Sequence, residues 1–222
     1  MNNMHMDKRQ IKQKTVKFGD EIEEISRFVK KGSVIVLPAK TVYGLSCRFD
    51  RKASLKRIYD IKNRNRKVSF IILISAIEDL NSFVLNINED TVKLINYYWN
   101  KDDPDPLTII FKKNPKLVDF ITGGKDTIAI RRAEFKFVRD IIDNSCPIVS
   151  TSATVSGIKT NPVNLDDIPS EILEKVDLIV DKGEKLLGIE STIIDAAGSE
   201  IRLVREGAVS FNDILQKLQI KI

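Results

Sequence analysis

The spacing of hydrophobic and polar residues alternates along the chain between a helical and a strand-like pattern. Apolar residues three or four positions apart predict helices over 20–31, 52–62, 90–99, 134–143 and 210–218. Short apolar runs rich in β-branched residues predict strands over 33–37, 69–74, 107–111, 127–131, 148–151, 178–180, 192–194 and 201–204. Asp20 can cap the first helix, and Gly32 can end it. Because helices and strands are interspersed, the pattern predicts an α/β domain.

The organisation of the chain favours a single domain. No internal repeat, low-complexity tract or Gly/Ser linker divides it. The strands near the C-terminus lack helical spacers, which predicts a twisted, mixed sheet with flanking helices rather than a purely parallel one. We assign residues 15–222 to this domain and expect residues 1–14 to form a disordered polar leader, without the apolar segment of a signal peptide.

The composition limits the chemistry that the protein can perform. Hydrophobic residues make up 42% and charged residues 30% of the 222 residues, and the net charge is +5. This modest positive charge fits an anionic ligand or a nucleic acid but requires neither. The single histidine, His5, lies in the leader, and Cys47 and Cys146 are far apart in the sequence. A zinc cage, a Ser–His–Asp triad and a disulfide framework are therefore excluded.

The same features predict where the protein works. Two isolated cysteines are typical of a reducing compartment. The longest apolar runs, such as 70–74, are too short to cross a bilayer. We expect a cytoplasmic protein with no membrane partner.

The first candidate segment is the loop 37–45, which contains Thr41 and follows a predicted strand. Ligands of open α/β sheets bind beyond the carboxyl ends of strands, so a threonine here is well placed. The alternative is a plain turn between two strands with Tyr43 packed inward, and spacing alone favours this alternative.

The second candidate is the basic segment from Arg51 to Lys67, in which eight cations accompany one acid, Asp60. Its last part, 62–67, lies where a helix gives way to a strand. Arginine and lysine side chains there suit a polyphosphate or an RNA backbone. The alternative is a solvated helix face, which we favour for the part from Arg51 to Arg57.

The third candidate is the segment 148–157, where a strand runs into a loop of hydroxyl side chains and Gly157. Such a loop can bind an anion with its hydroxyls and backbone N–H groups, or it can be an ordinary Ser/Thr turn.

The fourth candidate combines the segments 188–195 and 203–207. Ser191 precedes one strand and Arg205 ends the next, so both could lie at one rim or simply face solvent. Neither a P-loop nor a Rossmann glycine motif occurs anywhere in the chain.

The order of these motifs is more specific than any one of them. Thr-Val-Tyr-Gly-Leu, Lys-x-Arg, Pro-Leu-Thr, Ile-Ala-Ile-Arg, Ser-Thr-Ser-Ala-x-x-Ser-Gly, Ser-Thr-Ile-Ile-Asp and Arg-x-Gly follow one another from about Ser33 to Val209. In this order they resemble the YrdC-like domain family, whose best-known members are threonylcarbamoyl-AMP synthases of tRNA modification. The resemblance is to the compact form of the family and implies a large basic concave face lined by the motif loops.

The resemblance implies a nucleotidyltransferase. Such an enzyme joins L-threonine, bicarbonate and ATP into L-threonylcarbamoyladenylate and releases pyrophosphate. Downstream transfer proteins then pass the threonylcarbamoyl group to adenosine 37 of tRNA. Adenylation works by positioning and by neutralising charge, for which Lys, Arg and Mg²⁺ suffice, so the absence of a structured histidine is no obstacle.

The resemblance also implies a role for each matching residue. Lys62 and Arg64 match the Lys-x-Arg pair that meets the nucleotide phosphates and are the expected catalytic cations. The residues expected on the threonine side are Thr41, Arg131, Ser150 and Ser191. The other residues expected to bind ATP are Thr127, Ser152, Thr160 and Arg205. No residue is assigned to a metal, and Mg²⁺ is expected to accompany ATP.

The chain departs from the family pattern at Ala39, Lys40, Asn65, Ala133 and Thr154. Lys40 replaces an acid and could strengthen anion binding while removing a route for holding a metal. These departures leave two alternatives to the synthase open. One is a paralogue that binds nucleotides, tRNA or double-stranded RNA without synthase activity. The other is a carbamoyl-phosphate-type relative with a different acceptor, which no residue favours over the synthase.

Overall fold

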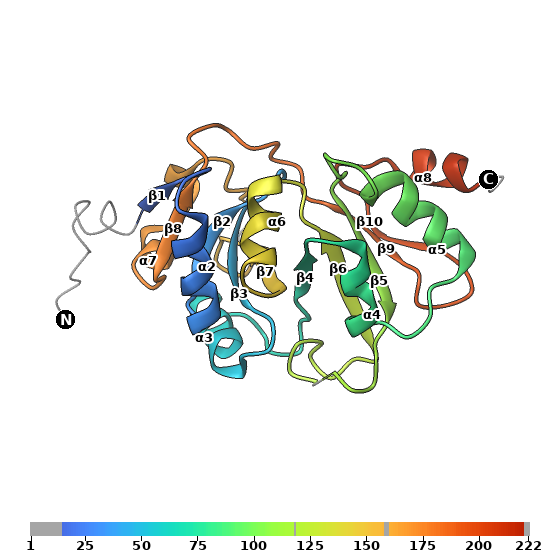
Figure 1. The fold of residues 1–222 in the computed structure, drawn as a ribbon, viewed down its shortest axis with the longest axis horizontal. Coiled ribbons are helices and arrows are strands. Elements are labelled where there is room, and N and C mark those ends of the chain that lie inside the picture. Colours follow the sequence, from blue (N-terminus) through green and yellow to red (C-terminus); the bar gives the residue numbers. More distant parts are fainter. Residues whose placement is uncertain (1–14, 118, 158–159, 220–222) are drawn as a thin grey trace.

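A single twisted sheet forms the centre of the molecule, with helices on both of its faces (Figure 1). The computed structural model describes residues 15–117, 119–157 and 160–219, so the expected leader 1–14 lies outside the described residues. In the described part the sheet has ten strands in the order β1-β8-β2-β3-β7-β4-β6-β5-β9-β10. Strands β1 and β10 are its edges, with β1 at the left of Figure 1 and β10 on the side of α5 and α8.

The elements have the following bounds. The strands are β1 Thr15–Lys17, β2 Ile35–Pro38, β3 Tyr43–Arg48, β4 Ile71–Ile74, β5 Leu107–Lys112, β6 Thr127–Arg132, β7 Ile148–Ser152, β8 Leu178–Asp181, β9 Thr192–Asp195 and β10 Arg202–Arg205. The α-helices are α2 Ile22–Lys31, α3 Lys52–Lys62, α4 Leu80–Phe83, α5 Glu89–Leu94, α6 Lys136–Asp143, α7 Ser170–Leu173 and α8 Phe211–Leu218. The short helices are η1 Ile77–Asp79, η2 Ile95–Trp99 and η3 Leu165–Asp167.

The sheet is mixed, as the sequence predicts. The parallel pairs are β1 with β8, β2 with β8, β4 with β6, and β5 with β9. The antiparallel pairs are β2 with β3, β3 with β7, β4 with β7, β5 with β6, and β9 with β10. Every predicted strand is present, and the predicted helix 90–99 is divided into α5 and the π-helical turn η2.

The segment 37–45 is the turn of a β-hairpin, in which Tyr43 belongs to β3 and is fully buried. This confirms the turn between two strands that the spacing favoured. The predicted cap of the first helix is wrong. Asp20 does not cap the first helix: Glu21 precedes α2 in a left-handed conformation and makes no side-chain cap. Gly32 ends α2 as predicted, with φ of 84°, a conformation that glycine adopts without strain.

One face of the sheet is covered over part of its width by α2 and α6. Ile25 and Val29 of α2 pack with Phe137 and Ile141 of α6 in one buried cluster. Leu37 and Leu73 belong to the same cluster, together with Ile148, and they come from strands β2, β4 and β7 of this face.

The larger core lies on the opposite face. There Val36, Leu45 and Ile72 pack with residues of helices α3, α4, α5 and α8, among them Ile58, Phe83, Leu94 and Ile214. Ile35 and Leu37 of β2 face one core, whereas Val36 and the preceding Val34 face the other. This alternation explains the continuous apolar run of the segment. In the described residues no helix is long and apolar enough to cross a membrane.

Gly207, which follows β10, lies close to the backbone of Glu190, which precedes β9, and this contact allows the fold to be tested. A Cβ atom at Gly207 would lie 2.2 Å from the carbonyl oxygen of Glu190, whereas one at Gly198 would meet nothing within 4 Å. We expect Gly207→Ala to lower the free energy of unfolding by about 1–3 kcal/mol, because backbone cannot give way cheaply. Gly198→Ala, measured by the same urea titration, should remain close to wild type. Equal stabilities of the two variants would contradict the contact.

Candidate functional site

A cavity of about 410 Å³ opens on the sheet face that α2 and α6 cover only in part. Its floor consists of small side chains that the strand register brings together. Gly44 lies opposite Ser152, and Ile71 lies opposite both Ser150 and Ala129. A Cβ atom at Gly44 would lie 2.5 Å from Oγ of Ser150. A side chain larger than that of glycine therefore does not fit at position 44 without displacing Ser150.

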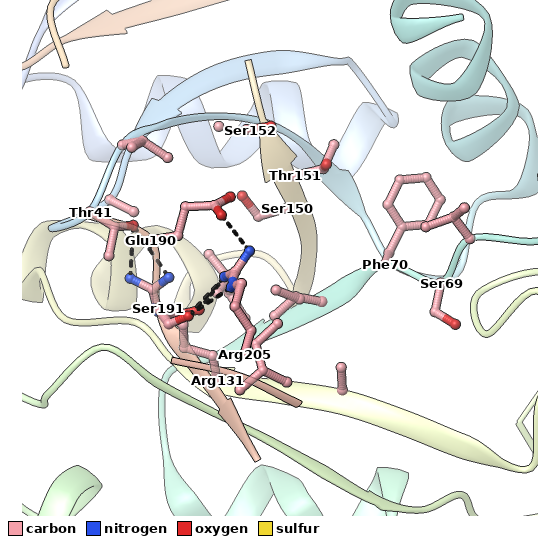
Figure 2. Close-up of a pocket in the computed structure, with 18 of the residues that line it drawn as sticks. Thr41, Ser69, Phe70, Arg131, Ser150, Thr151, Ser152, Glu190, Ser191 and Arg205 are labelled. Carbon is pink, nitrogen blue, oxygen red and sulfur yellow. Dashed lines mark hydrogen bonds and ion pairs between the residues drawn. The ribbon is translucent and has the colours of Figure 1, made fainter. Parts of the chain in front are cut away.

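Arg131, near the end of β6, forms one end of the cavity (Figure 2). Its side chain is 7% exposed, and Nε donates to the carboxylate of Glu134, which is 2% exposed. Its two terminal nitrogens approach Oγ1 of Thr41 at 3.4 and 3.3 Å. These two contacts are long for N–H···O hydrogen bonds. The outer edge of the guanidinium therefore retains donors for an anion in the cavity.

Arg64 contributes a second cation from the loop after α3. Nη1 donates to Oγ1 of Thr151 at 2.7 Å, and Nη2 donates to the carbonyl of Ser69 at 2.9 Å. The guanidinium lies over the ring of Phe70, 5.5 Å from its centroid. Burial lowers the pKa of Arg64, and its Nε is buried without a partner among the described residues. The side chain is thus held firmly but not fully satisfied.

Lys62 is buried behind the hydroxyl loop rather than in the cavity. It is 1% exposed, and its Nζ donates to the carbonyl of Thr154 at 2.5 Å and to that of Ser152. Burial, together with the charge of Arg64, lowers its pKa to about 7, and the charge of Glu190 opposes this shift. Lys62 lines an adjoining hollow of about 350 Å³, which it shares with Arg64 and Ser152. Its contacts fix the backbone of residues 152–154.

Arg205 and Glu190 form the wall contributed by the last two strands. Arg205 donates to Glu190 from Nη1 at 2.6 Å and to the carbonyl of Ser191 from Nη2 at 2.8 Å (Figure 2). The Ser191 hydroxyl in turn lies 2.8 Å from Oγ1 of Thr108 on β5. Figure 2 shows the Glu190 carboxylate directed into the cavity, toward Ser150.

The structure brings most of the sequence-predicted residues together. Those that line the cavity are Thr41, Arg64, Arg131, Ser150, Ser152, Ser191 and Arg205. Thr127 lies at the start of β6, four residues before Arg131 on the same face, and does not line the cavity. Thr160 is exposed and lines neither hollow.

The departures from the family pattern have visible consequences. Lys40 donates to Asp103 at 2.6 Å, so its charge is paired outside the wall that Ala39 and Thr41 form. Lys40 is therefore not an added cation of the cavity. Thr154 is buried, and its hydroxyl lies 3.1 Å from that of Ser152.

Sequence reasoning missed four residues of the site. Lys125, Ser69 and Phe70 line the cavity from segments that carried no motif, so no spacing signal could have indicated them. Glu190 lies inside the fourth candidate segment, next to Ser191, but was given no role. The sequence could have indicated Glu190 by its chemistry, because it is an acid next to the hydroxyl of Ser191 and can pair with Arg205, fifteen residues later.

The charges of the cavity define what it can bind. Arg64, Lys125, Arg131 and Arg205 are its cations, and Glu190 is the only carboxylate among its described lining residues. Arg131 reaches it from β6 and Arg64 from the loop after α3, so the arrangement suits a ligand with separate anionic groups. No group of three or more His, Cys, Asp or Glu side chains that could hold a metal occurs in the described part of the chain.

Comparison with known proteins identifies the family. A family model of the Sua5, YciO and YrdC proteins, described as telomere recombination, matches residues 27–207. The chain belongs to the Sua5/YciO/YrdC family. This confirms the resemblance that the ordered motifs indicated, and it places the cavity within the matched region, since its lining residues run from Ala39 to Arg205.

Several family members are threonylcarbamoyl-AMP synthases by name. That of Pyrococcus abyssi is 32% identical over 188 residues, which are 84% of this chain and 54% of the relative. A putative one from Methanocaldococcus jannaschii is 30% identical over 194 residues, which are 86% of this chain and 89% of the relative. The chain thus spans about half the length of the first relative (54%) and most of the second (89%).

Solved structures of the family share the fold. Pyrococcus abyssi Sua5 complexed with L-threonine has a TM-score of 0.83 at 30% identity, covering 91% of this chain and 59% of that one. Escherichia coli YciO has a TM-score of 0.77 at 21% identity, covering 92% of this chain and 97% of that one, and supports the fold alone. The single α/β domain with a mixed sheet is thereby confirmed.

The buried pair of Arg131 and Glu134 predicts a large stability effect. Removing one partner of a buried ion pair leaves the other charge uncompensated, which costs about 3–5 kcal/mol. We expect Glu134→Ala to lower the free energy of unfolding in urea by this amount, and Glu134→Gln, which can still accept from Nε, to lower it less. Glu200→Ala is the control, because Glu200 pairs with Arg202 where both side chains are 76% exposed. A loss for Glu134→Ala no larger than for the control would contradict this role.

The lowered pKa of Lys62 predicts a pH dependence of stability. With a pKa of about 7 in the folded protein and the ordinary lysine pKa of 10.5 when unfolded, the unfolded chain binds more protons between these values. The free energy of unfolding should therefore rise with pH from about 7 upward. We expect urea titrations between pH 7 and pH 9 to show a steeper rise for wild type than for Lys62→Met, by up to about 1.4 kcal/mol per pH unit. Parallel pH profiles would show that Lys62 keeps its ordinary pKa.

Proposed function

We propose that this protein is an L-threonylcarbamoyladenylate synthase. It would join L-threonine, bicarbonate and ATP into threonylcarbamoyl-AMP, with release of pyrophosphate and water, for the modification of adenosine 37 of tRNA. The observation that carries the proposal is one cavity with a carboxylate-binding end at Arg131 and further cations at Arg64 and Arg205. The names of the relatives, and the complex of one of them with L-threonine, agree with it.

The amino-acid end of the cavity centres on Arg131. Its terminal nitrogens carry only long contacts to Thr41, so a carboxylate can accept two parallel hydrogen bonds there. Thr41 itself can accept or donate to the substrate, and Ser150 and Ser191 add hydroxyls to the same cavity. This arrangement supports the threonine-side roles of Thr41, Arg131, Ser150 and Ser191.

The nucleotide end would use Arg64, Ser152 and Arg205. Arg64 and Ser152 line both the cavity and the adjoining hollow, so a polyphosphate can pass from one to the other. Lys62 acts through the loop that it holds, since its amine is bound to the carbonyls of Ser152 and Thr154. Thr127 and Thr160 lie outside this arrangement.

The residues of the cavity would promote the reaction by binding and orienting the substrates and by neutralising the charge of the phosphates. Arg131 holds the amino acid by its carboxylate, while Arg64 and Arg205 stabilise the charge that grows on the departing pyrophosphate. Mg²⁺ fits this site as an ion carried by the nucleotide, because it commonly binds through substrate phosphates and keeps its waters. Glu190 is the only carboxylate that the described lining offers. When bound, the ion would neutralise phosphate charge.

Partners and location belong to the same proposal. The product would be handed to downstream transfer proteins and finally to tRNA, in the cytoplasm, where the two free cysteines stay reduced. In the basic segment, Lys56 and Arg66 pair with Asp60, and Arg57 pairs with Asp177. This pairing weakens the case for a module whose main task is to bind RNA.

A pyrophosphate-release assay tests the proposal. We expect release that requires L-threonine, bicarbonate and ATP together. Arg64→Ala should slow it by about 10²–10³-fold, because a charged contact to the transferring phosphates is lost. Arg66→Ala is the matched control, since Arg66 is 65% exposed, pairs with Asp60 and does not line the cavity.

Other results would reject the proposal. Pyrophosphate release that ignores threonine would indicate a different acceptor. No release, together with tight binding of tRNA that weakens steeply with salt, would favour the RNA-binding alternative.

A further inference from the structure

Among the lining residues that the structure describes, Glu190 is the one acidic side chain beside the cations of the cavity. It pairs with Arg205 at 2.6 Å, and its side chain is 40% exposed, so it faces the cavity rather than the core. Its charge also acts on Lys62, whose pKa it tends to raise. None of the threonine or ATP contacts derived above uses Glu190.

Arg205 does not depend on Glu190 for its position. Nε and Nη2 of Arg205 donate to the carbonyl of Ser191 at 3.2 and 2.8 Å, while only Nη1 donates to Glu190. If the Glu190 carboxylate turned to another cation, Arg205 would stay at the rim with Nη1 free. The ion pair is therefore an exchangeable contact between two residues that can each bind a ligand.

The chemistry of an amino-acid substrate requires an acceptor of this kind. An amino acid binds as a zwitterion, so a site that holds its carboxylate on Arg131 places an ammonium group close by. Arg64, Lys125 and Arg205 repel an ammonium group, and Glu190 is the lining carboxylate that can attract it. Figure 2 shows the Glu190 carboxylate in the same view as the guanidinium of Arg131 and the hydroxyl of Thr41, within one cavity.

We propose that Glu190 is a specificity-determining residue that binds the α-ammonium group of the amino-acid substrate and thereby releases Arg205 for the nucleotide phosphates. This inference rests on the proposed function, whose two substrate ends it connects. When the ammonium group takes the place of Arg205 at Glu190, Arg205 becomes free to bind phosphate, so the amino acid strengthens nucleotide binding. By thermodynamic linkage, the nucleotide favours amino-acid binding by the same factor.

Isothermal titration calorimetry on the whole chain tests the proposal, with L-threonine and α,β-methylene-ATP plus Mg²⁺ as ligands. This nucleotide cannot be cleaved between its α- and β-phosphates, so only binding is measured. The key variant is Glu190→Gln, which keeps the size of the side chain and removes its charge. Glu184→Gln is the matched control, because Glu184 pairs with Lys182 in the same connection between β8 and β9 and does not line the cavity.

The expected results differ in direction for the two ligands. Glu190→Gln should weaken L-threonine binding by about 10–100-fold, the value of a charge-assisted hydrogen bond. It should strengthen nucleotide binding in the absence of threonine, because Arg205 is already free, and the mutual enhancement of the two ligands should disappear. Glu190→Asp should restore part of the enhancement, and Glu184→Gln should behave as wild type.

A third ligand tests the ammonium group directly. In 2,3-dihydroxybutyrate a hydroxyl replaces the ammonium of threonine. Wild type should bind this hydroxy acid at least ten-fold more weakly than L-threonine, and Glu190→Gln should discriminate much less between them.

The opposite results would overturn the inference. If Glu190→Gln bound threonine as tightly as wild type, or if the two ligands still enhanced each other's binding, Glu190 would not bind the ammonium group. The proposed function would be unaffected. Weaker nucleotide binding by Glu190→Gln would instead indicate that the carboxylate serves Mg²⁺. Wild type that neither binds L-threonine nor releases pyrophosphate in its presence would reject the proposed function and this inference with it.

Discussion

The register of the central strands determines where this molecule can bind anything. Strands β3, β7, β4 and β6 are paired so that Gly44, Ser150 and Ala129 share one sheet face. A shift of one residue in any of these strands would turn its small side chains to the opposite core. The hollow on this face, and every side chain that reaches into it, therefore depend on backbone pairing formed by residues far apart in the sequence.

The cations around this hollow are stabilised mainly by internal oxygen atoms. Arg64 relies on a hydroxyl and a carbonyl, and Lys62 relies on two carbonyls of the loop 152–154. Arg131 has a full counter-charge in Glu134, whereas the partner of Arg205 lies in the cavity itself. Carbonyl groups orient a cation without cancelling its charge, so the site keeps a strong positive field for an anionic ligand.

The sequence predicted the strands well because their apolar runs are buried on both faces, as in β2 and β8. The sequence did not predict β3 as a strand. Its residues alternate between larger side chains, such as Tyr43 and Leu45, and small ones, such as Gly44 and Ser46, and do not form an apolar run. The sequence placed Thr41, Arg131 and Arg205 at one site through the order of the motifs. It could not foresee that Lys62 turns toward Ser152 and Thr154, or that Asp103 binds Lys40, since those contacts depend on how distant loops meet.

The cavity draws its walls from nearly the whole length of the chain, from Ala39 to Arg205. In the described part of the chain, strand β1 at the edge opposite β10 pairs with β8, whose last residue is Asp181. A ribosome-bound chain that lacks β9 and β10 consequently has the floor and Arg131 but not Ser191, Arg205 or Glu190. The cavity is therefore complete only after β9 and β10 have joined the sheet.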